Sequence, residues 1–145
     1  MQSRAFSQSE LKDVAGEVLA HARTHETVGA SILALHGDLG AGKTSLTQAL
    51  AALLGVQGEV TSPTFVILKS YTTTDVHFRT LVHIDAYRLE GAEELAVLNF
   101  DDMVKDPHTL IVIEWAERVA SLIPKDALEI TLAHAPNEQR TLSYA

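Results

Sequence analysis

The sequence predicts an α/β domain built around a mixed, mostly parallel β-sheet with antiparallel strands at its edge. Along much of the chain, short apolar runs typical of strands alternate with helical patterns, as in parallel sheets covered by helices on both faces. A glycine-rich segment over residues 37–42 joins one apolar run to a helix, and two strand-like runs close the sequence as a hairpin. No repeat, linker or low-complexity segment interrupts the pattern, so we expect one domain over residues 1–145.

The first helix is predicted to begin at a capping box, with Ser7 as N-cap and Glu10 at the third helical position. Apolar residues then recur at helical spacing over residues 11–22. We expect this helix to end near residues 23–25.

The other elements follow from the same periodicities. Strands are predicted over residues 31–36, 64–69, 79–85, 109–115, 128–132 and 140–144, and helices over residues 43–54, 92–98 and 116–122. Gly55 is expected to end the second helix and Pro124 to stop the last one.

The composition limits the class of protein. The chain has 145 residues and no cysteine, which excludes a disulfide-held scaffold and a cysteine-based site. Its 19 Asp and Glu outnumber its 11 Lys and Arg, whereas proteins that grip nucleic acid alone usually carry a basic excess. Any role in a nucleic acid process is therefore expected to run through protein partners. No signal peptide pattern and no apolar run of ~20 residues is present, which predicts a soluble, cytoplasmic protein without a membrane anchor.

The strongest motif is the pattern G-x-x-x-x-G-K-[ST] over residues 37–44. It lies between a predicted strand and a predicted helix, the context that a phosphate-binding P-loop requires. Its glycines let backbone N–H groups point inward, and the helix N-terminus adds a positive dipole end. Lys43 supplies a charge for the β- and γ-phosphates, and the Thr44 hydroxyl is a ligand for Mg²⁺. The sequence thus predicts a P-loop ATPase.

Two carboxylates stand where apolar strands end. Asp85 follows residues 81–84, and Glu114 follows residues 110–113. In a parallel sheet both would lie at the carboxyl edge beside the P-loop, where either could hold Mg²⁺ or orient the attacking water. The alternative is that each merely caps its strand and pairs with a neighbour, and the pattern does not rank the two.

Residues 61–65 are a candidate nucleotide-sensing loop between the P-loop helix and the next strand. GTPase-like folds keep a switch segment at this place, with a hydroxyl that meets the γ-phosphate or Mg²⁺. Ser62 and Thr64 could supply that hydroxyl. An ordinary turn is the alternative.

Other residues are interpreted structurally. His21 and His25 lie four apart on the first helix without an evident third ligand, which favours a solvated helix face over a metal site. His36 is interpreted as the last strand residue. Trp115 is expected to pack in the core or at an interface rather than against a base.

Four blocks of sequence together resemble the TsaE family, the bacterial ATPases of tRNA threonylcarbamoyladenosine synthesis. They are residues 37–44, Ser62-Pro63-Thr64-Phe65, residues 83–89 and Ile113-Glu114-Trp115, and the resemblance spans nearly the whole chain. It implies a three-layer α/β domain and a Mg²⁺-dependent ATPase that is weak alone. It also implies that the protein works with the partners TsaB and TsaD to sustain multiple turnovers, reaching tRNA through that complex.

The resemblance also implies roles for individual residues. Lys43, Asp85 and Glu114 would serve catalysis, with Asp85 as the Walker B-like acid and Glu114 as a metal or water-positioning group. Thr44, Asp85 and Glu114 would be the metal residues. The nucleotide would be held by Gly40, Ala41, Gly42, Lys43, Thr44, Ser45 and Arg140. Arg88 and Arg118 are candidates for an arginine finger. Phe65 and Asn99 depart from the family's usual Tyr and Gly, away from the predicted chemistry.

Three other functions compete with this one. A small-molecule kinase shares the loop, but the arginines of this chain do not cluster as in a kinase lid. A GTPase would carry the guanine-reading N-K-x-D pattern, which is absent. A nucleotide-gated binding module would use the same loop without turnover.

Overall fold

A computed structural model describes residues 2–38, 40–58, 60, 68–87, 89, 94 and 98–144 of the chain. Its strands are β1 (Gln2–Phe6), β2 (Ser31–His36), β3 (Leu68–Thr72), β4 (Thr80–Asp85), β5 (Thr109–Glu114), β6 (Leu128–His134) and β7 (Arg140–Tyr144). Its helices are α1 (Leu11–Thr24), α2 (Lys43–Leu53) and α4 (Phe100–Met103), with 3₁₀ segments η1 (Gln8–Glu10) and η2 (Ala116–Leu122).

The strands form one seven-stranded sheet in the order β1-β7-β6-β2-β5-β4-β3. Strands β6, β2, β5 and β4 run parallel, while β3, β7 and β1 join antiparallel at the two sides. This confirms the mixed sheet with a parallel centre and antiparallel edges. Because parallel strands end at the same edge, the residues after β2, β4 and β5 are brought together there.

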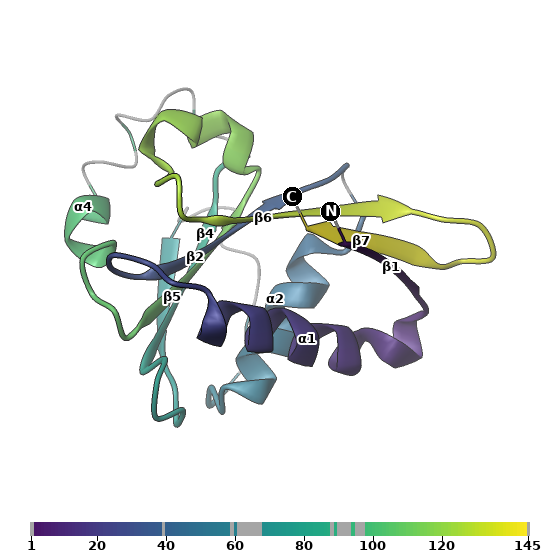
Figure 1. The fold of residues 1–145 in the computed structure, drawn as a ribbon, viewed down its shortest axis with the longest axis horizontal. Helices are drawn as coiled ribbons and strands as arrows, with labels where there is room; N and C mark the ends of the chain where they lie inside the picture. Colours follow the sequence, from purple (N-terminus) through teal and green to yellow (C-terminus); the bar gives the residue numbers. More distant parts are fainter. Residues whose placement is uncertain are drawn as a thin grey trace.

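Two hydrophobic cores lie on opposite faces of the sheet. One packs α1 and α2 against alternate residues of the strands, such as Leu33 and Val112. The other packs α4 and η2 against the intervening residues, such as Ile32 and Ile111. Figure 1 shows α1 and α2 together on one side of the sheet, with α4 away from them. The layers are therefore helix, sheet and helix, as the resemblance implied.

The structure departs from the sequence-based expectations at the ends and in short elements. The segment Gln2–Phe6 was not predicted as a strand, yet it pairs with β7 and places the two ends of the chain side by side (Figure 1). The four-residue α4 was not predicted either. The helix expected over 116–122 is a 3₁₀ segment with a kink at Val119. Within the described residues, the strand expected over 64–69 starts at Leu68 and continues to Thr72, while most of the helix expected over 92–98 lies outside them.

The closing hairpin turns through two residues with positive φ, Asn137 and Glu138. The Gln139 N–H donates to the Pro136 carbonyl at 3.3 Å, so the pair forms a tight two-residue turn. Since β6 runs parallel to β2, the hairpin turns at the carboxyl edge of the sheet. Strand β7 therefore starts at that edge, with Arg140 opposite His134.

Asp75 fastens the turn between β3 and β4 to α1. Its carboxylate accepts hydrogen bonds from the backbone N–H groups of His77 (3.1 Å) and Phe78 (2.8 Å), and from the two terminal nitrogens of Arg23 (3.0 and 2.6 Å). Arg23, and then these backbone donors, hold the pKa of the Asp75 carboxyl well below its ordinary value against the opposing effect of burial. The charged form of Asp75 is thus stabilised by folding.

We predict that Asp75→Asn lowers the free energy of unfolding at pH 7 by about 1–3 kcal/mol, because Arg23 loses a charged partner. The native pKa lies below the unfolded value, so this stabilisation is complete above that value and declines as the pH falls below about 4. Urea denaturation of both proteins across this range should show the gap narrowing with acid. The exposed Asp101→Asn is the control, and a gap that stayed constant with pH would contradict the assignment.

Candidate active site

The P-loop runs from the end of β2 into α2. Gly42 is the N-cap of α2 and has φ +107°, a backbone conformation that is strained for residues with a side chain. Its carbonyl accepts the first helical hydrogen bond, from the Leu46 N–H at 2.9 Å. Gly37 has φ +142°, and a Cβ there would lie 2.3 Å from the Leu132 carbonyl oxygen of β6. The loop therefore depends on glycine both to curl and to pack against β6.

Lys43 is folded back over its own loop. Its ammonium donates to the carbonyls of Gly37 (2.6 Å) and Asp38 (3.0 Å) and lies 4.3 Å from the centre of the Trp115 ring. Only 5% of Lys43 is exposed. The residue that the motif assigns to phosphate is thus held in the curve of the loop.

The electrostatics around Lys43 are acidic. Burial lowers the pKa of the Lys43 ammonium, and the carboxylates of Glu114, Glu117, Asp85 and, least, Asp38 oppose this effect. Both predicted acidic residues therefore act on Lys43 through space, and Glu114 acts most strongly.

Glu114 is joined directly to the P-loop helix. The Thr44 hydroxyl lies 3.0 and 3.1 Å from the two oxygens of the Glu114 carboxylate, to which it donates. Glu114 is the last residue of β5 and only 3% exposed. The residue beside it, Leu35, belongs to β2, so the sheet register itself delivers the carboxylate to the loop.

Asp85 lies next to Glu114 at the same edge. The two residues are register partners on the parallel strands β4 and β5. An Asp85 oxygen accepts a hydrogen bond from the Tyr87 backbone N–H at 3.0 Å. The expectation that both strand-end acids meet beside the P-loop is confirmed, and Glu114 is the one bonded to Thr44.

Arg140 reaches the loop from the other side. Its Nη2 donates to the Gly40 carbonyl at 3.2 Å, and a Cβ on Gly42 would lie 3.3 Å from its Cδ. Its Nε is buried without a hydrogen-bond partner among the described residues. Arg140 thus lies against the loop, where the resemblance placed a nucleotide contact.

The remaining predicted site residues are distributed as follows. Ala41 is buried, with its N–H 3.0 Å from the Asp38 carbonyl, and Ser45 lies in the first turn of α2. The Arg118 guanidinium lies 5.5 Å from the centre of the Tyr87 ring. Ser62, Thr64 and Arg88 lie outside the described residues.

Two contributors to the site were missed from the sequence. His83 is fully buried and pairs with Glu114, and Glu117 acts on Lys43 and lies 3.0 Å from His36. His83 precedes Asp85 by two residues on one strand, and side chains at that spacing share a face. That spacing was the available signal for His83.

The donor set suits Mg²⁺. In the described part of the chain no group of three or more His, Cys, Asp or Glu side chains is arranged to hold a metal ion. Mg²⁺ usually takes one or two carboxylates and completes its shell with waters and substrate phosphates. The Thr44 hydroxyl and the Glu114 and Asp85 carboxylates supply oxygens of that kind.

His21 and His25 are both exposed, as expected, and a ring nitrogen of His25 forms a hydrogen bond with the Asp126 carbonyl.

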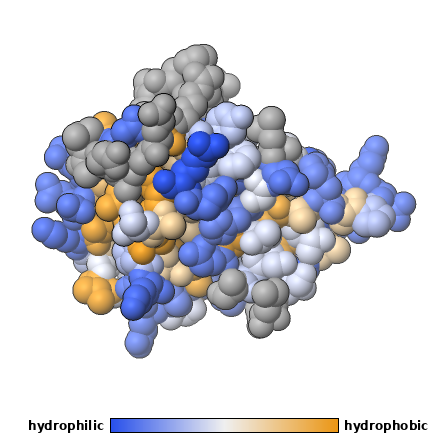
Figure 2. Space-filling model, turned by 90° about the horizontal axis from the view of Figure 1, so that it is seen from above, coloured by the Kyte–Doolittle hydropathy of each residue, from blue (hydrophilic) through white to orange (hydrophobic). Residues whose placement is uncertain are grey.

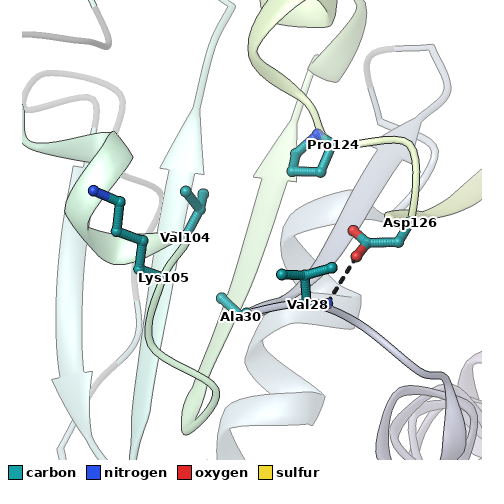
Figure 3. A pocket seen from close by; sticks show the side chains of 7 residues that line it. Val28, Ala30, Val104, Lys105, Pro124 and Asp126 are labelled. Atoms are coloured by element: carbon teal, nitrogen blue, oxygen red, sulfur yellow. Dashed lines mark hydrogen bonds between the residues drawn. The ribbon is translucent and has the colours of Figure 1, made fainter.

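A separate pocket of about 330 Å³ lies at the opposite end of β2. Figure 3 shows it between Val28, Val104 and Pro124, with the Val28 N–H donating to the Asp126 carboxylate at 3.0 Å. The six residues of β2 separate it from the P-loop by about 20 Å. It is therefore distinct from the candidate active site.

Some large hydrophobic side chains are exposed on the surface. The face in Figure 2 is mostly hydrophilic, with hydrophobic residues between the polar ones. Among the described large hydrophobic residues, Val28, Val76 and Tyr87 are exposed. Tyr87 follows β4 and lies at the carboxyl edge, where its ring centre is 5.0 Å from that of Trp115.

No helix in the described part of the chain combines the length and apolar character needed to cross a membrane.

Known proteins match both the sequence and the fold. The family model described as "Threonylcarbamoyl adenosine biosynthesis protein TsaE" matches residues 6–142. The crystal structure of YdiB from Bacillus subtilis superposes with a TM-score of 0.68 at 27% identity, covering 99% of this chain and 83% of that one.

Curated relatives give the same result. The tRNA threonylcarbamoyladenosine biosynthesis protein TsaE of Streptomyces coelicolor is 42% identical over 72% of this chain and 69% of its own length. The protein of the same name from Treponema pallidum is 40% identical over 79% of this chain and 82% of its own. That of Bacillus subtilis is 33% identical over 97% of this chain and 82% of its own. The chain therefore belongs to the TsaE family of threonylcarbamoyladenosine biosynthesis proteins.

Proposed function

We propose that this chain binds ATP with Mg²⁺ at residues 37–44 and hydrolyses it to support tRNA threonylcarbamoyladenosine synthesis together with TsaB- and TsaD-like proteins. The observation that carries the proposal is the hydrogen bond from the Thr44 hydroxyl to the Glu114 carboxylate. It couples the P-loop helix to an acidic strand end, which is the arrangement that Mg²⁺-nucleotide chemistry needs.

The phosphates would be held by the loop and its two cations. Backbone N–H groups at the start of α2 and the helix dipole attract the anion. Lys43 would exchange the Gly37 and Asp38 carbonyls for phosphate oxygens, which form stronger, charge-assisted hydrogen bonds. Arg140 would exchange the Gly40 carbonyl, to which its Nη2 donates, for a phosphate oxygen.

Glu114 and Asp85 would divide the remaining work. The bound Mg²⁺ would neutralise charge that develops on the phosphates. Thr44 and Glu114 would hold that ion at the loop, and Asp85 would hold the ion or the attacking water at the adjacent register position. Arg118, a candidate arginine finger, packs on the Tyr87 ring instead of reaching over the phosphates. We therefore expect slow turnover alone and stimulation by a partner.

The charge of the chain favours partners over direct tRNA binding. With a formal charge of −8, the surface would repel a polyanion. The chain would therefore act on a complex that itself holds the tRNA. We also propose that it is a single domain and that it works in the cytoplasm.

Lys43→Ala should weaken both nucleotide binding and turnover, lowering kcat/KM for ATP by about 100-fold or more, because a buried cation facing the phosphates is lost. Calorimetric binding and phosphate release would be measured together. Lys12→Ala, on the exposed face of α1, serves as control. Unchanged ATP binding and hydrolysis in the Lys43 variant would rule out the assignment.

Glu114→Gln should separate binding from chemistry. The amide keeps the size of the side chain but loses the charge that would hold Mg²⁺, so ATP without Mg²⁺ should still bind while turnover falls by about 100-fold or more. The exposed Glu26→Gln is the matched control. Hydrolysis at the normal rate would remove Glu114 from the catalytic machinery.

The biosynthetic role is tested by reconstitution. TsaB, TsaD, tRNA and a source of threonylcarbamoyl-adenylate are combined with ATP, with and without this chain, and modified tRNA is counted per enzyme complex. We expect several rounds of modification only when the chain is present. Equal multiple turnover without it would disprove the role, and full support from Glu114→Gln would favour nucleotide gating without hydrolysis.

A further inference from the structure

His83 occupies a buried position in the middle of β4, directly beneath the candidate site. It lies opposite Val112 on β5, two residues before Asp85, whose own register partner is Glu114. The His83 and Glu114 side chains are therefore diagonal neighbours on one face of a parallel pair, close enough for long side chains to meet.

The two side chains are joined by a hydrogen bond between the His83 Nε2 and a Glu114 carboxylate oxygen. The other ring nitrogen, Nδ1, is buried and has no hydrogen-bond partner among the described residues. Since an ionised carboxylate only accepts, Nε2 must carry the proton of this bond. A neutral ring with its proton on Nε2 leaves only an acceptor lone pair unsatisfied at Nδ1.

The Glu114 carboxylate is thus held from two sides. Thr44 of α2 donates from the P-loop helix, and His83 donates from β4. A carboxylate that is 3% exposed has little water to satisfy it and depends on such donors for a fixed orientation.

A structural role alone does not account for His83. The flanking β4 residues Val82 and Ile84 are apolar and buried, and an apolar side chain at 83 would avoid burying an unsatisfied ring nitrogen. The polar contact that His83 makes among the described residues is the one to Glu114. The contact with Glu114 is therefore the interaction that can offset the free-energy cost of burying this imidazole.

We propose that His83 is a positioning residue that orients the Glu114 carboxylate toward the Mg²⁺-nucleotide, by donating its Nε2 proton from beneath the P-loop. This inference rests on the proposed function. Partners that orient metal-ligating carboxylates typically contribute about 10- to 100-fold in metal affinity or activity.

The test compares His83→Asn with His83→Gln. The Gln amide nitrogen reaches about the position of Nε2 and can donate to Glu114, whereas the Asn amide reaches only that of Nδ1. A nonhydrolysable ATP analogue is titrated with EDTA and then with Mg²⁺. Binding is followed through the fluorescence of Trp115, the one tryptophan of the chain, which lies against Lys43.

We expect the Mg²⁺-free affinity to stay unchanged in both variants. The gain in affinity that Mg²⁺ provides should fall about 10- to 100-fold in His83→Asn and be largely retained in His83→Gln. A full Mg²⁺ gain in His83→Asn would overturn the inference. Equal loss of Mg²⁺-free and Mg²⁺-bound affinity in both variants would also overturn it, since that is the result of a purely structural role.

A second measurement needs no variant at position 83 to fold. Long-range ¹H–¹⁵N NMR of the unmodified chain reports which ring nitrogen of His83 carries the proton. We expect the Nε2–H tautomer and a shift of that proton in Glu114→Gln, and an Nδ1–H tautomer would overturn the inference. If the unmodified chain showed no Mg²⁺-dependent nucleotide binding, the proposed function would fail together with this role. If it showed such binding and His83→Asn did too, only the role of His83 would fail.

Discussion

The bond between the Thr44 hydroxyl and the Glu114 carboxylate ties together the two parts of the molecule on which the site depends. Thr44 belongs to the helix that follows β2, and Glu114 ends the neighbouring strand β5. The bond exists because β2 and β5 are parallel and in register, with Leu35 beside Glu114. Any shift of that register by one residue would turn Glu114 to the other face of the sheet. The register of β2 and β5 therefore determines whether Glu114 can reach Thr44.

The antiparallel edge of the sheet serves the same site. The β6–β7 hairpin turns at the carboxyl edge, so its second strand begins with Arg140 beside Gly40 and Gly42. Strand β6 also provides the Leu132 carbonyl against which Gly37 packs. The hairpin thus contacts the P-loop from the side opposite β5, and β1 completes the pairing of β7.

The sequence predicted what short-range patterns determine. Apolar runs located the central strands, and the P-loop motif located α2, because each signal lies within about ten residues. The strand β1 depends on pairing with β7 at the far end of the chain, which no local pattern encodes. The choice between Asp85 and Glu114 beside Thr44, and the contact of His83 with Glu114, likewise depend on register and side-chain direction. Arg140 was placed at the loop through resemblance alone, since 100 positions of sequence separate it from Gly40.

The charge around Lys43 supports the role proposed for the imidazole at position 83. Glu114, Glu117 and Asp85 all act on this one buried ammonium, so a nucleotide that arrived alone would meet carboxylates as well as Lys43 and Arg140. At the proposed site a divalent cation would relieve that repulsion, provided that Glu114 kept its negative charge available. A lysine beneath Glu114 would hold the carboxylate but would also compete with the cation for it. An imidazole that donates a single Nε2 proton, as proposed for His83, would orient the carboxylate and leave its charge to the metal.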